Sequence, residues 1–378
     1  MNAIKYLRRT EKFEFLVIFL LVFVIMVCIS YFGNIIFDRF LELKGGDAEE
    51  YFNMSYSPFE GKSPPFKYRI LTPLIVYLLP INHLNGFIII NLISLFLTAM
   101  LLYYYLKKLD FRSKDSLIGV LFFLLSPVVI FTMNDIVLVD ALSFLLLLLT
   151  FYAILCKNDI LYLFFLILGI LNKETVLLTI PLFFLYKLEN NKFIDTLKST
   201  IFLLIPVFIV FIGIRFYVGF SSYYTLHLIE ENISFHLRHL NSIFYIPWEI
   251  YASFGLLWII CLLNLNKIEN NFLNKSFYLL PIIFIQLFIA TDIFRMLFIA
   301  FPIIIPMSLY IFRCKYSILT LSILFSLSTV IIFIKLYVSS NIYASILDTL
   351  LSILIWIILL ILLLKNLQKS DTLLSIYK

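Results

Sequence analysis

The sequence has little charge, little glycine and few cysteines. Only 14% of its 378 residues are charged and 62% are hydrophobic, a balance that excludes an ordinary soluble globular protein. The four cysteines, Cys28, Cys156, Cys261 and Cys314, form no Cys-x-x-Cys pair, so neither a disulfide framework nor a zinc site is indicated. The sequence also lacks a phosphate-binding glycine loop and a hydrolase nucleophile elbow. The net charge of +6 is explained by lysine-rich cytoplasmic loops and requires no nucleic acid.

Apolar runs recur along the chain and predict an all-α polytopic membrane protein, with 1–378 as a single transmembrane domain. The first run follows a basic N-terminal segment and is too long for a signal-peptide core, so we interpret it as an uncleaved anchor. About twelve passes are predicted, which puts both termini on the cytoplasmic side of the plasma membrane. The runs are 15–37, 86–106, 116–133, 136–156, 159–171, 176–187, 198–219, 248–265, 276–290, 296–312, 317–337 and 345–364.

The runs 159–171 and 176–187 are too short to cross a bilayer, since the first reaches only about 20 Å as a helix against a hydrocarbon core of about 30 Å. They either join into one long helix or form a tucked-in, re-entrant hairpin with Lys173 and Glu174 at its tip. With a hairpin, 19 of the 29 basic residues lie on the cytoplasmic side and 10 on the outer side. The positive-inside rule therefore favours the hairpin.

The first outer loop, residues 38–85, carries a candidate catalytic carboxylate. Asp47 follows a glycine pair that permits a tight turn, and Tyr51 lies one helical turn further on. Asp47 could act as a general base on a hydroxyl group, or help to bind a divalent cation together with a neighbouring glutamate. It could equally be part of a solvated acidic loop. Tyr68 and Arg69 directly precede a short apolar run, 70–80, within this loop. The guanidinium group of Arg69 suits a phosphate or carboxylate, or simply marks a helix end.

Several charged residues lie inside or beside the apolar runs. A charged side chain near the bilayer centre costs about 2.5–3.5 kcal/mol, so charges that persist there usually line a wet cavity. Some also have a structural explanation, because Lys173 can neutralise Glu174 and because Asp292 and Arg295 can pair at i,i+3. Asp135 reads as an ordinary polar turn residue. The candidate substrate-binding residues around Asp47 are Tyr51, Tyr68, Arg69, Asp140, Lys173, Glu174, Arg215, His236, His239, Asp292 and Arg295, with the two histidines in a second outer loop, 220–247.

This arrangement resembles the GT-C superfamily of integral membrane glycosyltransferases. In that family, a first span leads into a long extracytoplasmic loop with an essential Asp or Glu near its start. Here Gly46-Asp47-x-x-x-Tyr51 occupies that position, and Tyr68-Arg69-x-Leu71-x-Pro73 resembles the element that often ends the loop. The segments Asn172-Lys173-Glu174-Thr175 and Asp292-x-x-Arg295 resemble elements of bacterial relatives.

The resemblance implies transfer of a sugar from a polyprenyl-phosphate donor to a hydroxyl group of a glycan, lipid or protein acceptor on the outer face, with inversion. Asp47 would be the base, and cations such as Arg69, Lys173, Arg215 and Arg295 would bind the leaving phosphate. Membrane lipids are expected partners, and a divalent cation stays open as a cofactor. The alternative is a transporter, flippase or polymerase of lipid-linked saccharides. A transporter would normally place charges on a path to both faces, often with an internal repeat.

Overall fold

The computed structural model describes residues 14–28, 30, 46–61, 63–220, 230, 245–255, 257–263, 268–286 and 292–310. All regular elements in these ranges are helical, as the apolar patterning predicts. They are a helix Glu14–Cys28, α2 (Gly46–Met54), η1 (Phe66–Tyr68), α3 (Leu71–Leu78), α4 (His83–Lys108), α5 (Ser113–Leu124), α6 (Pro127–Asn134), α7 (Asp140–Leu155), α8 (Asp159–Asn172), η2 (Glu174–Thr179), α9 (Ile180–Lys187), α10 (Phe193–Val218), α12 (Tyr245–Phe254), α13 (Leu257–Leu263), α14 (Asn271–Phe277), α15 (Leu280–Ile285), α16 (Ile293–Leu297), η6 (Phe298–Ala300) and α17 (Phe301–Leu309).

Some of these helices are apolar and long enough to cross a membrane, which is consistent with a membrane protein. They are α4 and α10, and the pair α5 and α6, bent by 56° at a short break, can form a third span. Several other predicted passes are divided into shorter helices. Proline at the start of a helix marks three such breaks, at Pro127, Pro281 and Pro302, because proline fits the first turn of a helix but not its interior. The total of twelve passes therefore stays a prediction, and the runs 317–337 and 345–364 lie outside the described residues.

The segment 159–187 folds back on itself. The rings of Tyr162 in α8 and Phe183 in α9 stack with their centroids 4.5 Å apart, and Lys187 forms an ion pair with Asp159. In one continuous helix, residues 162 and 183 would be about 30 Å apart. The predicted hairpin is thus confirmed, with Lys173 and η2 at its turn.

Phenylalanine rings hold the middle of the bundle together. Phe298 in η6 packs against Phe123 of α5, Phe144 of α7, Phe254 of α12 and Phe301 of α17, with ring centroids 5.0–5.9 Å apart. Lipid tails are as apolar as these side chains, so close packing rather than transfer from water favours helix association inside a membrane. One tightly packed residue thereby joins α5, α7 and α12, which come from distant parts of the chain, to its own segment.

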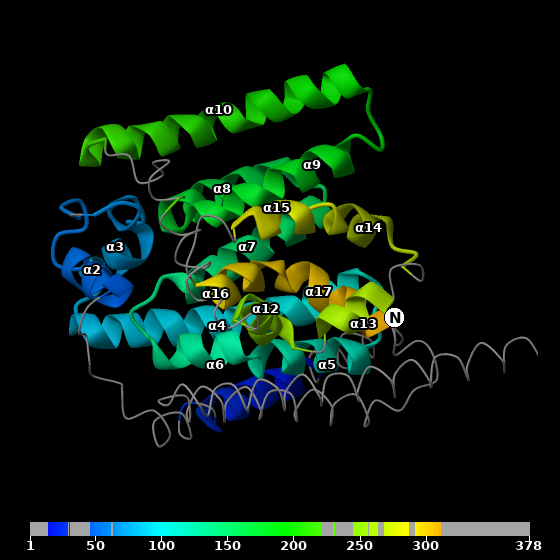
Figure 1. Ribbon diagram of the computed structural model, residues 1–378, viewed down its shortest axis with the longest axis horizontal. Coiled ribbons are helices and arrows are strands. Elements are labelled where there is room, and N and C mark those ends of the chain that lie inside the picture. Colours follow the sequence, from blue (N-terminus) through cyan, green and yellow to red (C-terminus); the bar gives the residue numbers. More distant parts are fainter. Residues whose placement is uncertain are drawn as a thin grey trace, which may run out of the picture.

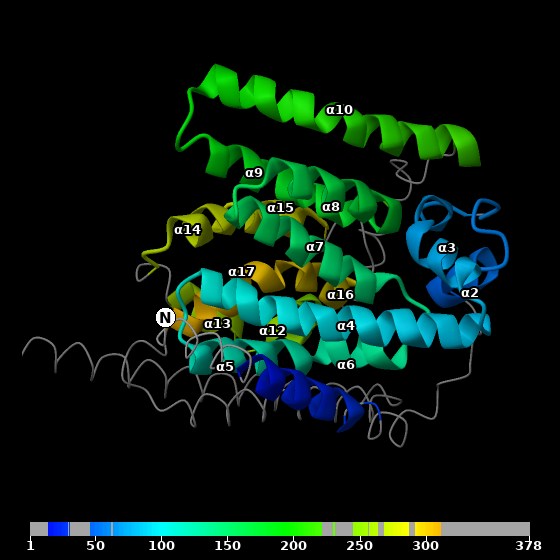
Figure 2. The same cartoon turned by 180° about the vertical axis from the view of Figure 1, so that it is seen from behind.

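The bundle has two chemically different ends (Figures 1 and 2). The helices α2 and α3 lie at one end, which we call the loop end, and α4 runs from there to the opposite, lysine end. A smaller apolar cluster that includes Tyr51, Ile70, Val76 and Phe87 seats the loop 38–85 on the bundle. The lysine end carries Lys107, Lys108, Arg112, Lys114, Lys157, Lys187, Lys192 and Lys198.

Candidate functional site

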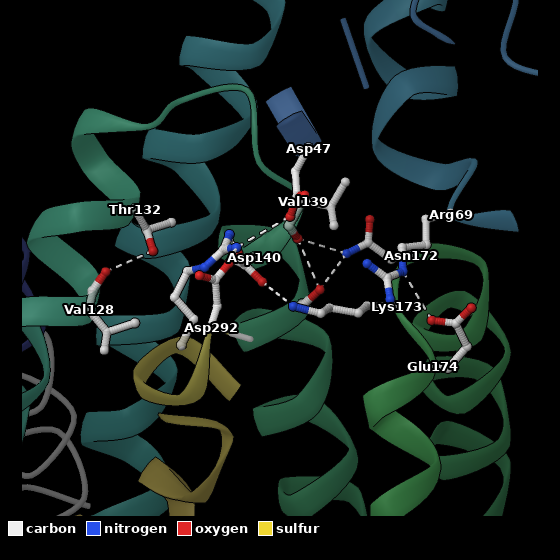
Figure 3. A network of polar contacts seen from close by, with 12 residues as sticks. Asp47, Arg69, Val128, Thr132, Val139, Asp140, Asn172, Lys173, Glu174 and Asp292 are labelled. Atoms are coloured by element: carbon white, nitrogen blue, oxygen red, sulfur yellow. Dashed lines mark hydrogen bonds and ion pairs between the residues drawn. The ribbon is translucent and has the colours of Figure 1, made fainter. Parts of the chain in front are cut away.

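Arg295, in α16 at the loop end, contacts three carboxylates. Its guanidinium nitrogens lie 3.3 Å from an oxygen of Asp47 and 3.2 Å from one of Asp140, and it also pairs with Asp292. The predicted i,i+3 pair of Asp292 and Arg295 is therefore confirmed. Arg295 also joins segments that are far apart in the sequence, since Asp47 lies in the first turn of α2 and Asp140 begins α7. Asp47, Asp140 and Asp292 lie close together in Figure 3.

Lys173 pairs with Asp140 and not with its neighbour Glu174. The alternative that Lys173 and Glu174 neutralise each other is therefore wrong. The physical reason is the backbone at Lys173, which is extended with φ −161° and ψ 129°. Successive side chains of an extended backbone point to opposite sides, so Lys173 turns toward α7 while Glu174 turns toward the loop 38–85.

Glu174 lies between two guanidinium groups. One carboxylate oxygen accepts a hydrogen bond from Nε of Arg69 at 3.0 Å, and the other lies 3.6 Å from Arg215. Arg69 also donates to the hydroxyl group of Tyr51 at 3.0 Å. The guanidinium carbon of Arg215 lies 4.5 Å from the centre of the Tyr68 ring, within the range of a cation–π contact. Tyr51, Tyr68, Arg69, Glu174 and Arg215 thus lie in one cluster.

The site divides into an anionic half and a cationic half. The anionic half contains three carboxylates, those of Asp47, Asp140 and Asp292, with two cations, Lys173 and Arg295, and so carries a net charge of −1. The cationic half contains Arg69 and Arg215 with the single carboxylate of Glu174, a net charge of +1. An anionic ligand would therefore be attracted to one side of the site while carboxylates remain on the other.

The residues of the anionic half differ in exposure. The side chains of Asp47 and Asp292 are 38% and 50% exposed, whereas that of Asp140 is 5% exposed. Arg295 and Lys173 are nearly buried, at 10% and 8%. The carboxylates of Asp47 and Asp292 are consequently accessible to solvent, while the buried carboxylate of Asp140 pairs with both cations.

Asn172, which the sequence analysis named only as part of a motif and not as a candidate site residue, is part of the site. It is fully buried, donates hydrogen bonds to the carbonyl oxygen of Val139 at 3.0 Å and to Ser143 at 2.8 Å, and accepts one from Thr72 at 2.6 Å. These bonds tie the end of α8 to α3 and α7, and so position Lys173. The sequence does contain a signal for this role, because Asn172 is a polar amide that follows the apolar run 159–171 and directly precedes Lys173 and Glu174.

Asp135 is a second residue whose environment the sequence did not indicate. It ends α6 in the turn before α7, and burial raises the pKa of its carboxyl group to about 6, partly offset by Arg295. Buried carboxylates favour the neutral form because the charged form loses its hydration. Asp135 is thus more than the ordinary turn residue that the sequence analysis took it for.

These contacts do not include the two candidate histidines, and they do not test whether a divalent cation binds. His236 and His239 lie outside the described residues. Within the described ranges, no three His, Cys, Asp or Glu side chains form a group that could hold a metal ion. Asp47 and Asp292 instead share Arg295.

Comparison with known proteins adds no relative: no protein-family model matches the chain, and a search of curated proteins finds no match.

Proposed function

We propose that this protein is a GT-C-like membrane glycosyltransferase of the plasma membrane. It transfers a sugar from a polyprenyl-phosphate donor to a hydroxyl group of a glycan, lipid or protein acceptor, with inversion at the sugar carbon. In this proposal the loop end faces the outside of the cell and the lysine end faces the cytoplasm, in accord with the positive-inside rule.

One observation carries the proposal. Charged residues from five separate parts of the chain meet at one end of an apolar bundle, and an exposed carboxylate, Asp47, is among them. Buried charges in a membrane protein are costly and usually serve a substrate path or an active site. This cluster lies at one end of the bundle, as expected for a transfer site at one membrane surface. A transport path would instead place such charges along the length of the bundle.

The division of the site matches the charges of the reaction. Asp47 takes the proton of the acceptor hydroxyl group as its oxygen forms a bond to the anomeric carbon. The bond from that carbon to the phosphate oxygen breaks, and polyprenyl phosphate leaves with the electron pair. Arg69 and Arg215 lie on the cationic side, where they stabilise the negative charge that develops on the phosphate.

Arg295 positions Asp47 directly, and Lys173 does so indirectly through Asp140 and Arg295. Arg295 orients the carboxylate of Asp47 at 3.3 Å, and is itself held by Asp140 and Asp292. Lys173 shares Asp140 with Arg295 and so fixes the geometry of this layer. Tyr51 and Tyr68 support the two arginines of the cationic half through a hydrogen bond and a ring contact.

The test is sugar transfer by Asp47→Asn in isolated membranes, measured from polyprenyl-phosphate donors carrying labelled sugars. The asparagine has nearly the same shape but cannot take a proton, so we expect transfer to fall by at least about 100-fold. Glu60→Gln is the matched control, because Glu60 is an exposed acid of the same loop, and we expect it to retain wild-type transfer. Wild-type transfer by Asp47→Asn would remove the proposed base.

A second measurement separates a transferase from a flippase. The purified protein is mixed in detergent with donor and acceptor, so that no leaflets exist between which a lipid could move. A transferase still forms a new glycosidic bond under these conditions, detectable by mass spectrometry of the acceptor. Movement of labelled lipid across vesicles, with no new bond in detergent for any donor tried, would contradict the proposal.

A further inference from the structure

A hollow lined by charged, amide and apolar side chains lies at the lysine end of the bundle, at the opposite end from the charge cluster around Arg295. It has a volume of about 270 Å³ and lies where α7 ends, α8 begins and α9 ends. Five of its eight lining residues have charged or amide side chains. The lining side chains are Ile154, Lys157, Asp159, Phe183, Tyr186, Lys187, Asn190 and Asn191.

The hollow carries a net positive charge, because two lysines face one carboxylate. Lys187 is paired with Asp159 and also donates to the hydroxyl group of Ser199 at 2.8 Å. Lys157 is exposed, and its ammonium group lies 5.6 Å from the centre of the Tyr186 ring. No carboxylate in the described part of the chain forms an ion pair with Lys157. The charge of Asp159 is thus compensated by Lys187, while that of Lys157 is available to an anion.

An apolar groove continues from this hollow along the outside of the bundle. It has a volume of about 430 Å³, lies between α8 and α10, and shares Asp159 with the hollow. Ser199, which binds Lys187, also lines this groove. Its other walls are apolar, and two of them are strongly exposed, since Ile160 and Phe202 are 81% and 77% exposed.

A positively charged hollow that opens into an apolar groove has the shape and polarity of an amphiphile with an anionic head. We propose that this region binds one anionic glycerophospholipid, with its phosphate beside Lys157 and Lys187 and an acyl chain along α8 and α10. Basic pockets between helices at a cytoplasmic membrane surface are suited to such headgroups. A zwitterionic lipid brings its own cation next to the phosphate, and so gains less from the two lysines.

The site is separate from the proposed glycosyl transfer, since none of its residues belongs to the cluster around Asp47. It spans the ends of α7, α8 and α9 together with α10, and a bound lipid would hold these elements together. Such a lipid would therefore stabilise the same hairpin whose tip carries Lys173.

The test is native mass spectrometry of the full chain released from detergent, with phosphatidylglycerol and phosphatidylcholine of identical acyl chains added at equal concentration. We expect wild-type protein to bind phosphatidylglycerol in preference. Lys157→Gln should lower the affinity of the protein for phosphatidylglycerol by about fivefold, which corresponds to the contribution of one lysine near an anionic lipid. Lys108→Gln, which removes an exposed lysine from the same end of the bundle, should leave it unchanged.

Further measurements distinguish a bound lipid from free phosphate and check that the variant folds. Phe202→Ser should weaken binding of the lipid through the groove, and inorganic phosphate should compete only at far higher concentration than phosphatidylglycerol. Equal binding of the two lipids by wild-type protein overturns the proposal, as does an unchanged preference in Lys157→Gln. Lys157 forms no ion pair within the described residues, so that variant should fold, which an unchanged circular dichroism spectrum would verify.

Discussion

Replacing the buried carboxylate of Asp140 provides the strongest test of the charge cluster. Asp140 is 3% exposed and pairs with both Lys173 and Arg295. In Asp140→Asn, Arg295 keeps Asp47 and Asp292 as partners. Lys173, itself only 7% exposed, loses the one carboxylate that pairs with it in the described part of the chain.

The expected magnitude follows from the cost of an unpaired buried charge. Removing one partner of a buried ion pair typically costs about 3–5 kcal/mol of unfolding free energy. We expect Asp140→Asn to lose an amount in this range, because it removes the carboxylate partner of the buried Lys173. Lys173→Met should lose less, because Asp140 keeps Arg295 as a partner. The double variant leaves no orphaned charge, so it should lose less than the sum of the two, with a coupling energy of at least about 2 kcal/mol.

The assay is equilibrium unfolding in mixed micelles, followed by circular dichroism at a helix wavelength. Asp159→Asn is the control, because it removes a carboxylate from an ion pair whose partners are 46% and 23% exposed. Exposed pairs contribute about 0–1 kcal/mol, so this variant should change stability little. If the losses from Asp140→Asn and Lys173→Met simply add in the double variant, the two side chains do not form a coupled pair and the reasoning fails.

Two other predictions concern the turn before α7 and the hairpin. The pKa of Asp135 is raised from 3.8 to about 6 in the folded protein. Between pH 3.8 and pH 6 the folded protein therefore keeps a proton on Asp135 that the unfolded chain has lost. The stability of the fold should consequently decrease as the pH rises through this range. Asp135→Asn should abolish this fall and be more stable at pH 7 by about 2–3 kcal/mol, whereas parallel unfolding curves from pH 4 to 7 would contradict it. A Cβ on Gly169 would lie 2.6 Å from the side chain of Val176, so Gly169→Ala should cost about 1–3 kcal/mol. Adding Val176→Ala should recover much of that loss, and the absence of any recovery in thermal unfolding would argue against this contact.

Two signals in the sequence together predicted the hairpin. Its two arms are each too short to span a bilayer, which left one long helix or a hairpin, and the positive-inside rule favoured the hairpin. The contact between Tyr162 and Phe183 confirms the fold-back. The positive-inside rule also grouped the charges of the loop end correctly, since Asp47, Asp140 and Arg295 do meet. Helix ends proved harder to predict, because proline and local turns divide several apolar runs that the sequence presents as continuous.

The sequence by itself determined that the chain is helical and that its deep charges gather at one end. The reason is that hydrocarbon demands internally satisfied backbone hydrogen bonds and disfavours isolated charge. Only the tertiary structure decided which charges meet. The extended backbone at Lys173 sends adjacent side chains to different partners, and Asn172 sets the distance between α8 and α7. Such pairings depend on the backbone direction at a few residues and on contacts between residues more than a hundred positions apart in the sequence. The pattern of hydrophobic residues contains information on neither.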